Sequence, residues 1–239
     1  MTWGEHLSAW WRDEVASDPA YRDEVVPLFL DVLQPEPGAR YLDLGCGEGR
    51  LMAEVAARGA RVVGCDRSPS LARSAREWGP VVVAGLPGLD WAAGGSFDGA
   101  YVVLVIEHLA DAATLFREAA RVVRPGGVLA LIANHPVITS PGSGPFVDPE
   151  DGEVVWRWGP YLEEGSSEEP AGGHPLTFHH RPLGMLLTSI AGAGWALERL
   201  VEFGVGEGRS AADPLLAAQR QVPRLLSGRW RRSPSGQTS

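Results

Sequence analysis

The spacing of apolar residues along the chain changes near residue 40. Before it, HLSAWWRDEV and AYRDEVVPLFLDVL carry apolar residues at helical spacing and are separated by Asp18 and Pro19. After it, short runs of Val, Leu and Ile alternate with amphipathic stretches that end in glycine. Near-continuous apolar strands that alternate with helices are typical of a parallel sheet covered on both faces. The pattern therefore predicts an α/β fold, with a doubly wound, Rossmann-like, seven-stranded, mostly parallel sheet and an N-terminal helical cover.

The regular pattern is interrupted after the fifth predicted strand. Residues 135–176 contain seven Pro, seven Gly and eight acidic residues against one Arg. A connection of this length and composition is typical of an irregular lid or a mobile insertion. Beyond it, HRPLGMLLTSIAGAG predicts a helix capped by His179 and His180, and WALERLVEFG predicts a strand. The last apolar stretch, DPLLAAQRQVPRLLSGRW, predicts a helix that runs into a short final strand.

These elements divide the chain into five parts. We expect a helical cover over residues 1–38, a cofactor-binding core over 39–134, a lid that binds the acceptor over 135–176, the rest of the core sheet over 177–230, and a disordered tail over 231–239.

A glycine-rich turn follows the first predicted strand. The sequence YLDLGCGEGRL, residues 41–51, places Gly45, Gly47 and Gly49 between this strand and a helix. Such glycines permit positive φ and let a ligand approach backbone N–H groups at the positive end of a helix dipole. The spacing is one residue shorter than that of dinucleotide sites, and Asp43 and Glu48 add negative charge. The turn is therefore predicted to bind a ligand that is cationic there, with a purely structural turn as the alternative.

Composition narrows the class of protein. With 239 residues and 44% hydrophobic content, the chain is long enough for one domain with a well-covered core. It has no apolar run of membrane-spanning length and no signal-peptide pattern, so we expect a soluble cytoplasmic protein. A net charge of −9 argues against nucleic-acid binding, because phosphates require a basic face. Cys46 and Cys65 are expected to be reduced and to pack inside the fold.

Four motifs resemble those of the class I S-adenosylmethionine-dependent methyltransferases. YLDLGCGEGRL is similar to the first motif of this family, and VVGCDRSPSL follows with Asp66 at the end of the second strand. SFDGAYVVLVIEHLAD and LFREAARVVRPGGVLALIAN are similar to the fourth- and fifth-strand motifs. TFHHRPLGMLLTSIAGAGWALERLVEF resembles a helix and strand of the bacterial small-molecule branch, the type 11-like methyltransferases. The resemblance covers residues 40–134 and 177–204.

The resemblance implies S-adenosylmethionine as the cofactor and S-adenosylhomocysteine as the product. It implies that Asp43 approaches the ammonium group of the cofactor and that Asp66 holds the ribose hydroxyls. An acid often follows the third strand in this family, but this chain has Gly85 and Leu86 there, so we expect backbone groups near Leu86 to contact the adenine. The expected cofactor-binding residues are Asp43, Gly45, Cys46, Gly47, Gly49, Asp66, Arg67, Ser68, Gly85, Leu86, Val103 and, from the helical cover, Tyr21.

Three residues are candidates for acid–base chemistry. Glu107 and His108 follow the fourth strand, and His135 follows the fifth, at the sheet edge where ligands bind in open α/β folds. Histidine is suited to this role because its pKa lies near neutrality. The alternative is that Glu107 and His108 only hydrogen-bond the turn that they open. Similar ubiquinone-pathway O-methyltransferases place a metal-binding acid before this pair, and this chain has Leu104 there, so we expect no metal requirement.

We therefore expect an S-adenosylmethionine-dependent methyltransferase that acts on a small molecule, with O-methylation in specialised metabolism as the predicted reaction. We expect no nucleic-acid or membrane partner, and a monomer or homodimer. Two alternatives remain open at this point. One is a cyclisation or rearrangement that keeps the cofactor as a bystander, and the other is a non-catalytic nucleotide-binding domain.

Overall fold

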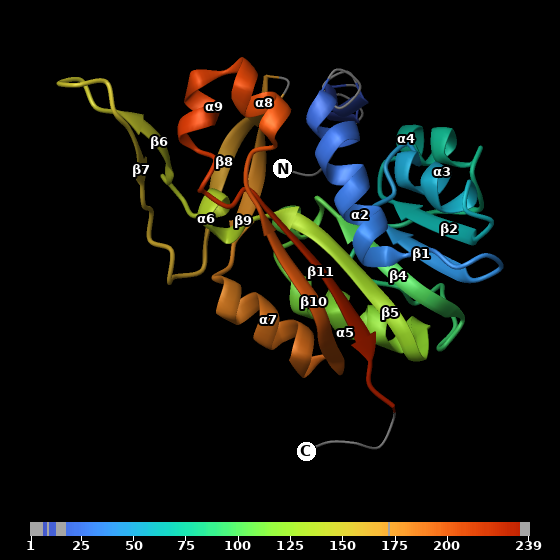
Figure 1. Cartoon of the computed structure of the whole chain (residues 1–239). Helices are drawn as coiled ribbons and strands as arrows, with labels where there is room; N and C mark the ends of the chain where they lie inside the picture. Colours follow the sequence, from blue (N-terminus) through green and yellow to red (C-terminus); the bar gives the residue numbers. More distant parts are fainter. Residues whose placement is uncertain (1–6, 9, 13–17, 172, 235–239) are drawn as a thin grey trace.

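A seven-stranded sheet forms the centre of the protein (Figure 1). The computed structural model describes residues 7, 8, 10–12, 18–171 and 173–234, so parts of the expected helical cover and of the expected tail lie outside the described residues. The strand order is β10-β11-β5-β4-β1-β2-β3, and only β11 runs antiparallel to its neighbours. The strands are β1 (Arg40–Leu44), β2 (Arg61–Asp66), β3 (Val81–Val83), β4 (Phe97–Val103), β5 (Val123–Asn134), β10 (Trp195–Phe203) and β11 (Leu225–Arg232). This sheet confirms the predicted doubly wound, mostly parallel architecture.

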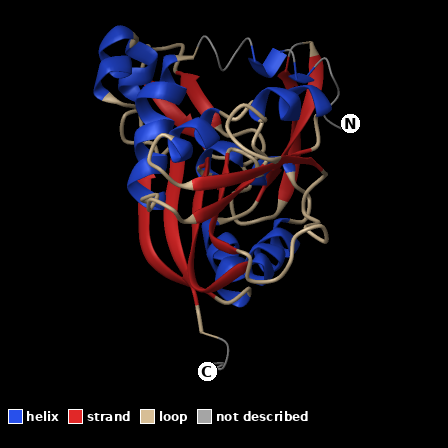
Figure 2. Cartoon of the chain, turned by 90° about the vertical axis from the view of Figure 1, so that its right-hand side faces the viewer, coloured by secondary structure: helices blue, strands red, loops and turns tan. Residues whose placement is uncertain are grey.

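Helices cover both faces of the sheet, as the turned view in Figure 2 shows. On one face, η1 (Tyr21–Val25), α2 (Val26–Leu33) and α3 (Arg50–Ala56) pack around Phe29 and Met52, which are fully buried. On the other face, α5 (Ala112–Val122) and α7 (Leu183–Gly192) pack around Phe116 and Ile190. The helix α4 (Pro69–Ala75) follows β2. Burial on both faces explains why the central strands read as continuous apolar runs.

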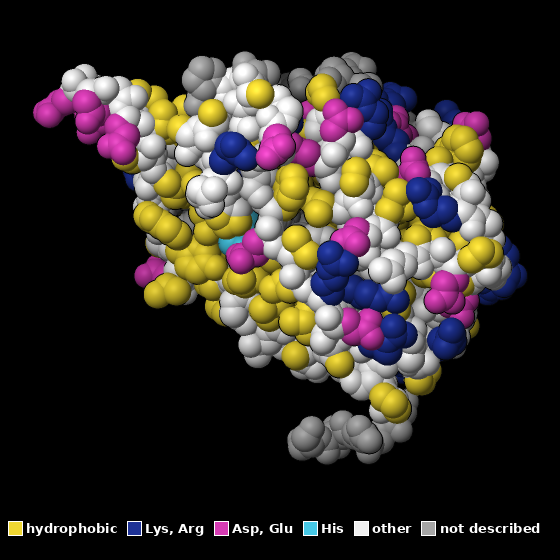
Figure 3. All heavy atoms as spheres, in the orientation of Figure 1, with side chains coloured by type: hydrophobic (Ala, Val, Ile, Leu, Met, Phe, Trp, Pro, Cys, Tyr) yellow, Lys and Arg dark blue, Asp and Glu magenta, His cyan; other side chains and the backbone are white. Residues whose placement is uncertain are grey.

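The insertion after β5 is more regular than the sequence indicated. It contains α6 (Pro136–Thr139) and two antiparallel hairpins, β6 (Gly144–Val147) with β7 (Val154–Arg157), and β8 (Gly165–Ala171) with β9 (His174–His180). The expectation of irregular chain here was wrong, because backbone pairing in a hairpin does not need an apolar run. Acidic side chains gather at the tip of the β6–β7 hairpin, at the upper left of Figure 3.

Two expectations about the C-terminal part also need correction. His179 and His180 belong to β9 and do not cap α7, whose N-cap residue is Pro182. The last strand, β11, is eight residues long and includes Arg231 and Arg232, so the expected disordered tail does not begin at residue 231. Both guanidinium groups donate to carbonyls at the start of β5, which holds the end of β11 in the sheet. Between β10 and β11 lie α8 (Glu207–Ala212) and α9 (Pro214–Ala218).

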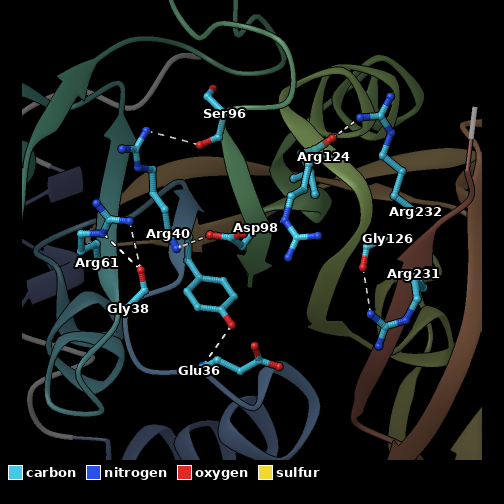
Figure 4. Close-up of polar contacts among 12 residues, drawn as sticks. Glu36, Gly38, Arg40, Arg61, Ser96, Asp98, Arg124, Gly126, Arg231 and Arg232 are labelled. Atoms are coloured by element: carbon cyan, nitrogen blue, oxygen red, sulfur yellow. Dashed lines mark hydrogen bonds and ion pairs between the residues drawn. The ribbon is translucent and has the colours of Figure 1, made fainter.

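Arginine residues form hydrogen bonds along the edge of the sheet at which the parallel strands begin (Figure 4). The carboxylate of Asp98, in β4, accepts from the backbone N–H of Arg40 at 2.7 Å and from the Arg124 guanidinium at 2.6 Å. Arg61 donates to the carbonyl of Gly38 at 3.1 Å. These contacts join four strands and the chain that precedes β1, so the opposite edge, where the strands end, is left for the site. Among the described residues, no helix is long and apolar enough to cross a membrane.

Candidate active site

The turn after β1 requires its glycines. Gly45, Gly47 and Gly49 have φ of 85°, 52° and 89°, a region that other residues rarely adopt. Gly45 also lies against Val105, because a Cβ at Gly45 would be 2.6 Å from Val105 Cγ2. The backbone N–H groups of Gly45 and Cys46 donate to the carbonyl of Cys65 in β2, at 2.9 and 3.0 Å. The loop is therefore fixed in shape and presents bare backbone to the space above the sheet.

Asp66 ties this loop to the second strand. One oxygen of its carboxylate accepts from the N–H of Gly47 at 2.9 Å, and the other accepts from the N–H of Ser68 at 2.8 Å. Ser68 is the N-cap of α4, where its hydroxyl accepts from the N–H of Leu71. Burial raises the pKa of Asp66, and the backbone donors oppose that rise. Because a carboxylate oxygen can accept more than one hydrogen bond, Asp66 still has capacity for ligand hydroxyls.

Asp43 is an acid inside a buried strand. It is 3% exposed and lies between Gly64 of β2 and Tyr101 of β4 in the sheet register. Burial raises its pKa well above the usual value, Tyr101 opposes that rise, and the charge of Asp66 adds to it. An ionised carboxylate in such a place is costly unless a positive group compensates it. A cationic ligand above the glycine turn would provide that compensation.

A cavity opens above the glycine turn, at the carboxyl ends of β1, β2 and β4. Its empty space, including the mouth open to solvent, is about 1000 Å³. The sequence-predicted residues Tyr21, Asp43, Gly45, Cys46 and Gly47 line it, as do Asp66, Arg67, Leu86, Val103 and His108. The ring of Tyr21 lies 5.8 Å from the Arg50 guanidinium carbon, which also lines this cavity. We call this space the inner cavity.

Other predicted residues lie away from the inner cavity. Gly49 packs against α4, where an added Cβ would be 2.8 Å from the Ala75 Cα, so this glycine serves the fold. Ser68 is buried at its capping position, and Gly85 is exposed on the surface. Cys46 and Cys65 are free and buried, as expected, and burial raises the pKa of the Cys65 thiol to about 12, which leaves it unreactive.

A second space, the outer cavity, adjoins the inner one. The two share Trp11, Tyr21, Leu104 and His108 as lining residues. Leu104 has φ of 54°, which is unusual for a residue other than glycine, and its N–H donates to the carbonyl of Ile132 at 2.8 Å. Its strained backbone thus sits at the point where β4 ends and the two cavities meet.

His108 is oriented by the inserted hairpin. It ends the short helix η2 (Ile106–His108), and its ring packs edge-on against Phe178 of β9, with the centroids 4.7 Å apart. Its Nδ1 lies 3.2 Å from the carbonyl oxygen of Thr177. A carbonyl can only accept, so Nδ1 carries the hydrogen, and in the neutral ring the lone pair is on Nε2. The hydrogen bond to Thr177 therefore sets the tautomer and the orientation of the ring.

Glu107 lies beside His108 but belongs to the outer cavity. Its side chain is 3% exposed, and its Oε1 accepts from both the backbone N–H and the side-chain amide of Asn134, at 3.2 and 2.7 Å. The guanidinium of Arg181 donates to the carbonyls of Ile106, Leu109 and Ala110, which fixes the turn around this pair.

His135 lies outside both cavities. It is 2% exposed and caps α6, because its Nδ1 accepts from the N–H of Val137 at 3.1 Å. Its Nε2 therefore carries the hydrogen and donates to Glu202 at 2.8 Å. Burial lowers the pKa of His135, and Glu202 opposes that change. With both nitrogens occupied, this histidine supports the connection between β5 and α6, and we do not retain it among the acid–base candidates.

Sequence reasoning missed several residues of the outer cavity. Phe178, Arg209 and Arg224 line it, and Thr177 orients His108. No spacing or motif marks these positions, because they come from the inserted hairpin and from segments near β11 that the fold brings together. The described residues contain no group of three or more His, Cys, Asp or Glu side chains arranged to hold a metal ion.

Known proteins share both the fold and the motifs. The sequence profile described as a methyltransferase domain matches residues 42–131. A crystal structure of an S-adenosylmethionine-dependent methyltransferase from Mesorhizobium loti is 30% identical, with a TM-score of 0.77, over 91% of this chain and all of that one. A demethylmenaquinone methyltransferase from Corynebacterium kroppenstedtii is 40% identical over 103 residues, which are 41% of this chain and 43% of that protein. A ubiquinone biosynthesis O-methyltransferase from a Methylobacterium species is also 40% identical, over 109 residues, with the same shares.

The mostly parallel sheet, the glycine turn and the acid that ends β2 define a Rossmann-like nucleotide-cofactor protein. The likeness to the Mesorhizobium structure extends over the whole of that chain. The protein belongs to the class I S-adenosylmethionine-dependent methyltransferases, and its cofactor is S-adenosylmethionine. The chain spans about half of the length, or less, of the curated relatives that it matches.

The inner cavity fits this cofactor chemically. Asp43 is a buried acid at the cavity wall, and a cationic group beside it would favour its ionised form, so it suits the cationic methionine portion. Asp66 retains acceptor capacity that would suit the ribose hydroxyls, and Leu86 lines the cavity with an apolar side chain that would suit the adenine. The bare backbone at Gly47, where an added Cβ would meet only Trp11 Nε1 at 4.0 Å, leaves room for the ligand to lie close to the loop.

Proposed function

We propose that the protein transfers the methyl group of S-adenosylmethionine to an oxygen atom of a small molecule, in specialised metabolism. The observation that carries this proposal is His108, which lines both cavities and whose Nδ1 lies 3.2 Å from the carbonyl oxygen of Thr177. The acceptor would occupy the outer cavity, next to the cofactor in the inner one. The names of the two curated relatives concern quinone compounds, which supports a small-molecule acceptor.

The chain's own residues would carry out binding, orientation and proton removal. When bound, S-adenosylmethionine supplies a methyl group on a sulfonium, so that transfer breaks the S–C bond, forms a C–O bond and yields S-adenosylhomocysteine and one proton. His108 would accept that proton at Nε2, and the carbonyl of Thr177 would stabilise the resulting imidazolium through Nδ1–H. Trp11, Tyr21 and Leu104, which line both cavities, would exclude water and align the acceptor.

The acidic protein surface favours a small acceptor over nucleic acid, and we propose a monomer or a homodimer. Two other functions remain as alternatives: a cyclisation or rearrangement in the same site, and a non-catalytic nucleotide-binding role. Recovery of S-adenosylhomocysteine in step with a methylated product separates methyl transfer from both.

The test is a methyl-transfer assay with a panel of phenols and alcohols, in which S-adenosylhomocysteine is quantified. For an accepted compound, His108→Gln should lower kcat by about 10²-fold or more, the range of general base catalysis, and change the dissociation constant of S-adenosylmethionine by less than about twofold. His179→Gln is the matched control, because His179 lies in β9 and lines neither cavity. An unchanged kcat in His108→Gln would remove His108 as the base, and no S-adenosylhomocysteine with any acceptor would refute methyl transfer.

A further inference from the structure

Two buried polar groups of the outer cavity have no hydrogen-bond partner among the described residues. One is Oε2 of Glu107, whose other oxygen is held by Asn134. The other is Nη1 of Arg224. A buried polar atom without a hydrogen-bond partner lowers the stability of the folded state. Such atoms are rare in native proteins, and they are most costly when they belong to a charged group. Because both atoms belong to residues that line one cavity, a ligand in that cavity is the natural partner for both.

Arg224 is held firmly at its place. Its backbone N–H donates to the carbonyl of Phe203 and its carbonyl accepts from the N–H of His135, both at 2.8 Å. The next residue, Leu225, pairs with Asn134 in the sheet, and Asn134 in turn binds Glu107. Arg224 and Glu107 are therefore connected through the same sheet edge, at the carboxyl end of β5. This backbone support would give a ligand-binding side chain a defined position.

The neighbouring charged residues are already engaged. Arg209 pairs with Glu24 at 3.3 Å, and the second oxygen of Glu24 accepts from the N–H of Gly206 at 3.1 Å. Asp18 accepts from the N–H of Ala20 at 2.8 Å. Burial lowers the pKa of Arg224, and the charge of Arg209 lowers it further, while Glu24 and Asp18 oppose this. An anion beside Arg224 would offset both unfavourable effects.

The rest of the outer cavity is apolar and partly aromatic. Trp10, Phe178, Ile138 and Leu176 form its walls, together with the shared Trp11. Its cavity volume is about 300 Å³, at the lower end of the range of small-molecule sites. Aromatic walls favour a ligand with a flat apolar body.

We propose that the outer cavity binds a hydroxy-carboxylic acid with a flat apolar body, whose carboxylate pairs with Arg224 and whose hydroxyl lies at Glu107 and His108. This inference rests on the proposed function, and it adds the chemical class of the acceptor. Arg224 then acts as a specificity residue and takes no part in the bond-forming step.

The experiment compares matched ligands in the presence of saturating S-adenosylhomocysteine. The probes are 4-hydroxycinnamate and 4-hydroxybenzoate, each measured against its own neutral amide, by quenching of tryptophan fluorescence and by calorimetry. The intact protein should bind at least one acid about tenfold or more tightly than its amide, as expected for a charge-assisted hydrogen bond. Arg224→Gln should reduce this ratio to about one, and Arg224→Lys, which keeps the charge, should retain part of it.

The controls separate this inference from the proposed function. Arg220→Gln removes an equal charge outside both cavities, at a side chain that is 49% exposed, and should keep the acid preference. Each variant is first shown to unfold at the temperature of the parent and to bind S-adenosylhomocysteine, which is independent of Arg224. Equal binding of acid and amide by the intact protein, no binding of either acid, or an acid preference that survives in Arg224→Gln would overturn the inference. Loss of cofactor binding in the parent would instead count against the proposed function.

Discussion

Gly45 and Gly47 lie in one loop, both with positive φ, yet their surroundings differ. A Cβ at Gly45 would be 2.6 Å from Val105 Cγ2, whereas the nearest atom to a Cβ at Gly47 is Trp11 Nε1 at 4.0 Å. Alanine at either position pays for left-handed backbone, about 1 kcal/mol. At Gly45 it must also displace a packed side chain, which costs about 1 to 3 kcal/mol more. We therefore expect Gly45→Ala to lower the free energy of unfolding by about 2 to 4 kcal/mol, and Gly47→Ala by about 1 kcal/mol.

Urea unfolding of the cofactor-free protein, followed by tryptophan fluorescence, measures both values. The cause of the difference is tested by adding Val105→Ala, because without its methyl groups the nearest remaining atom, Val105 Cβ, is 3.5 Å from the new side chain. A double-mutant cycle should then show a favourable coupling of about 1 to 3 kcal/mol between positions 45 and 105. Equal losses in the two alanine variants, or a coupling near zero, would show that the crowding inferred at Gly45 is not real.

Two further predictions concern buried titratable groups. Burial raises the pKa of Asp43 above 3.8, so the folded state holds the proton more tightly and stability falls as pH rises from that value through the folded pKa. Asp43→Asn should therefore raise the urea midpoint at pH 8 and weaken S-adenosylmethionine binding by about tenfold or more; an unchanged affinity would contradict the role given to Asp43. Burial lowers the pKa of His135 below 6.5, so the unfolded chain binds the proton first and stability is lost as pH falls below 6.5 toward the folded pKa. His135→Asn keeps a capping oxygen without that titration, so its stability should vary less between pH 7 and pH 5 than that of the parent; an equally steep loss would assign the titration elsewhere.

The parts of the site that could be predicted from the sequence are those determined by neighbouring residues. The strand that contains Asp43, the glycines that follow it and Asp66 at the end of β2 all lie within 30 residues, and each has a local physical signature in spacing or charge. Periodicity identified the strands of the central sheet because burial on both faces makes them apolar throughout.

The parts that could not be predicted depend on contacts between distant segments. The strand β8 reads GSSEEPA and contains no large apolar residue, so no hydrophobic pattern marks it, and only its pairing with β9 makes it a strand. The position of Arg224 depends on backbone hydrogen bonds with Phe203 and His135. The tautomer of His108 depends on a hydrogen bond to the carbonyl of Thr177. In the sequence, His135 and His108 look alike because each follows a strand. Only the fold shows that His135 caps α6 and binds Glu202, whereas His108 lines both cavities.

Apart from four shared residues, the inner and outer cavities are lined by different parts of the chain. Apart from the shared residues, the inner cavity is built by the loops that follow β1 to β4, whereas the outer cavity takes Phe178 from β9 and Arg209 and Arg224 from segments beside β11. The residues that line only the outer cavity can therefore be replaced while the residues that line the inner cavity stay unchanged. Grafting the β8–β9 hairpin and residues 204–224 from a relative should transplant acceptor preference, while S-adenosylmethionine affinity stays with the recipient core.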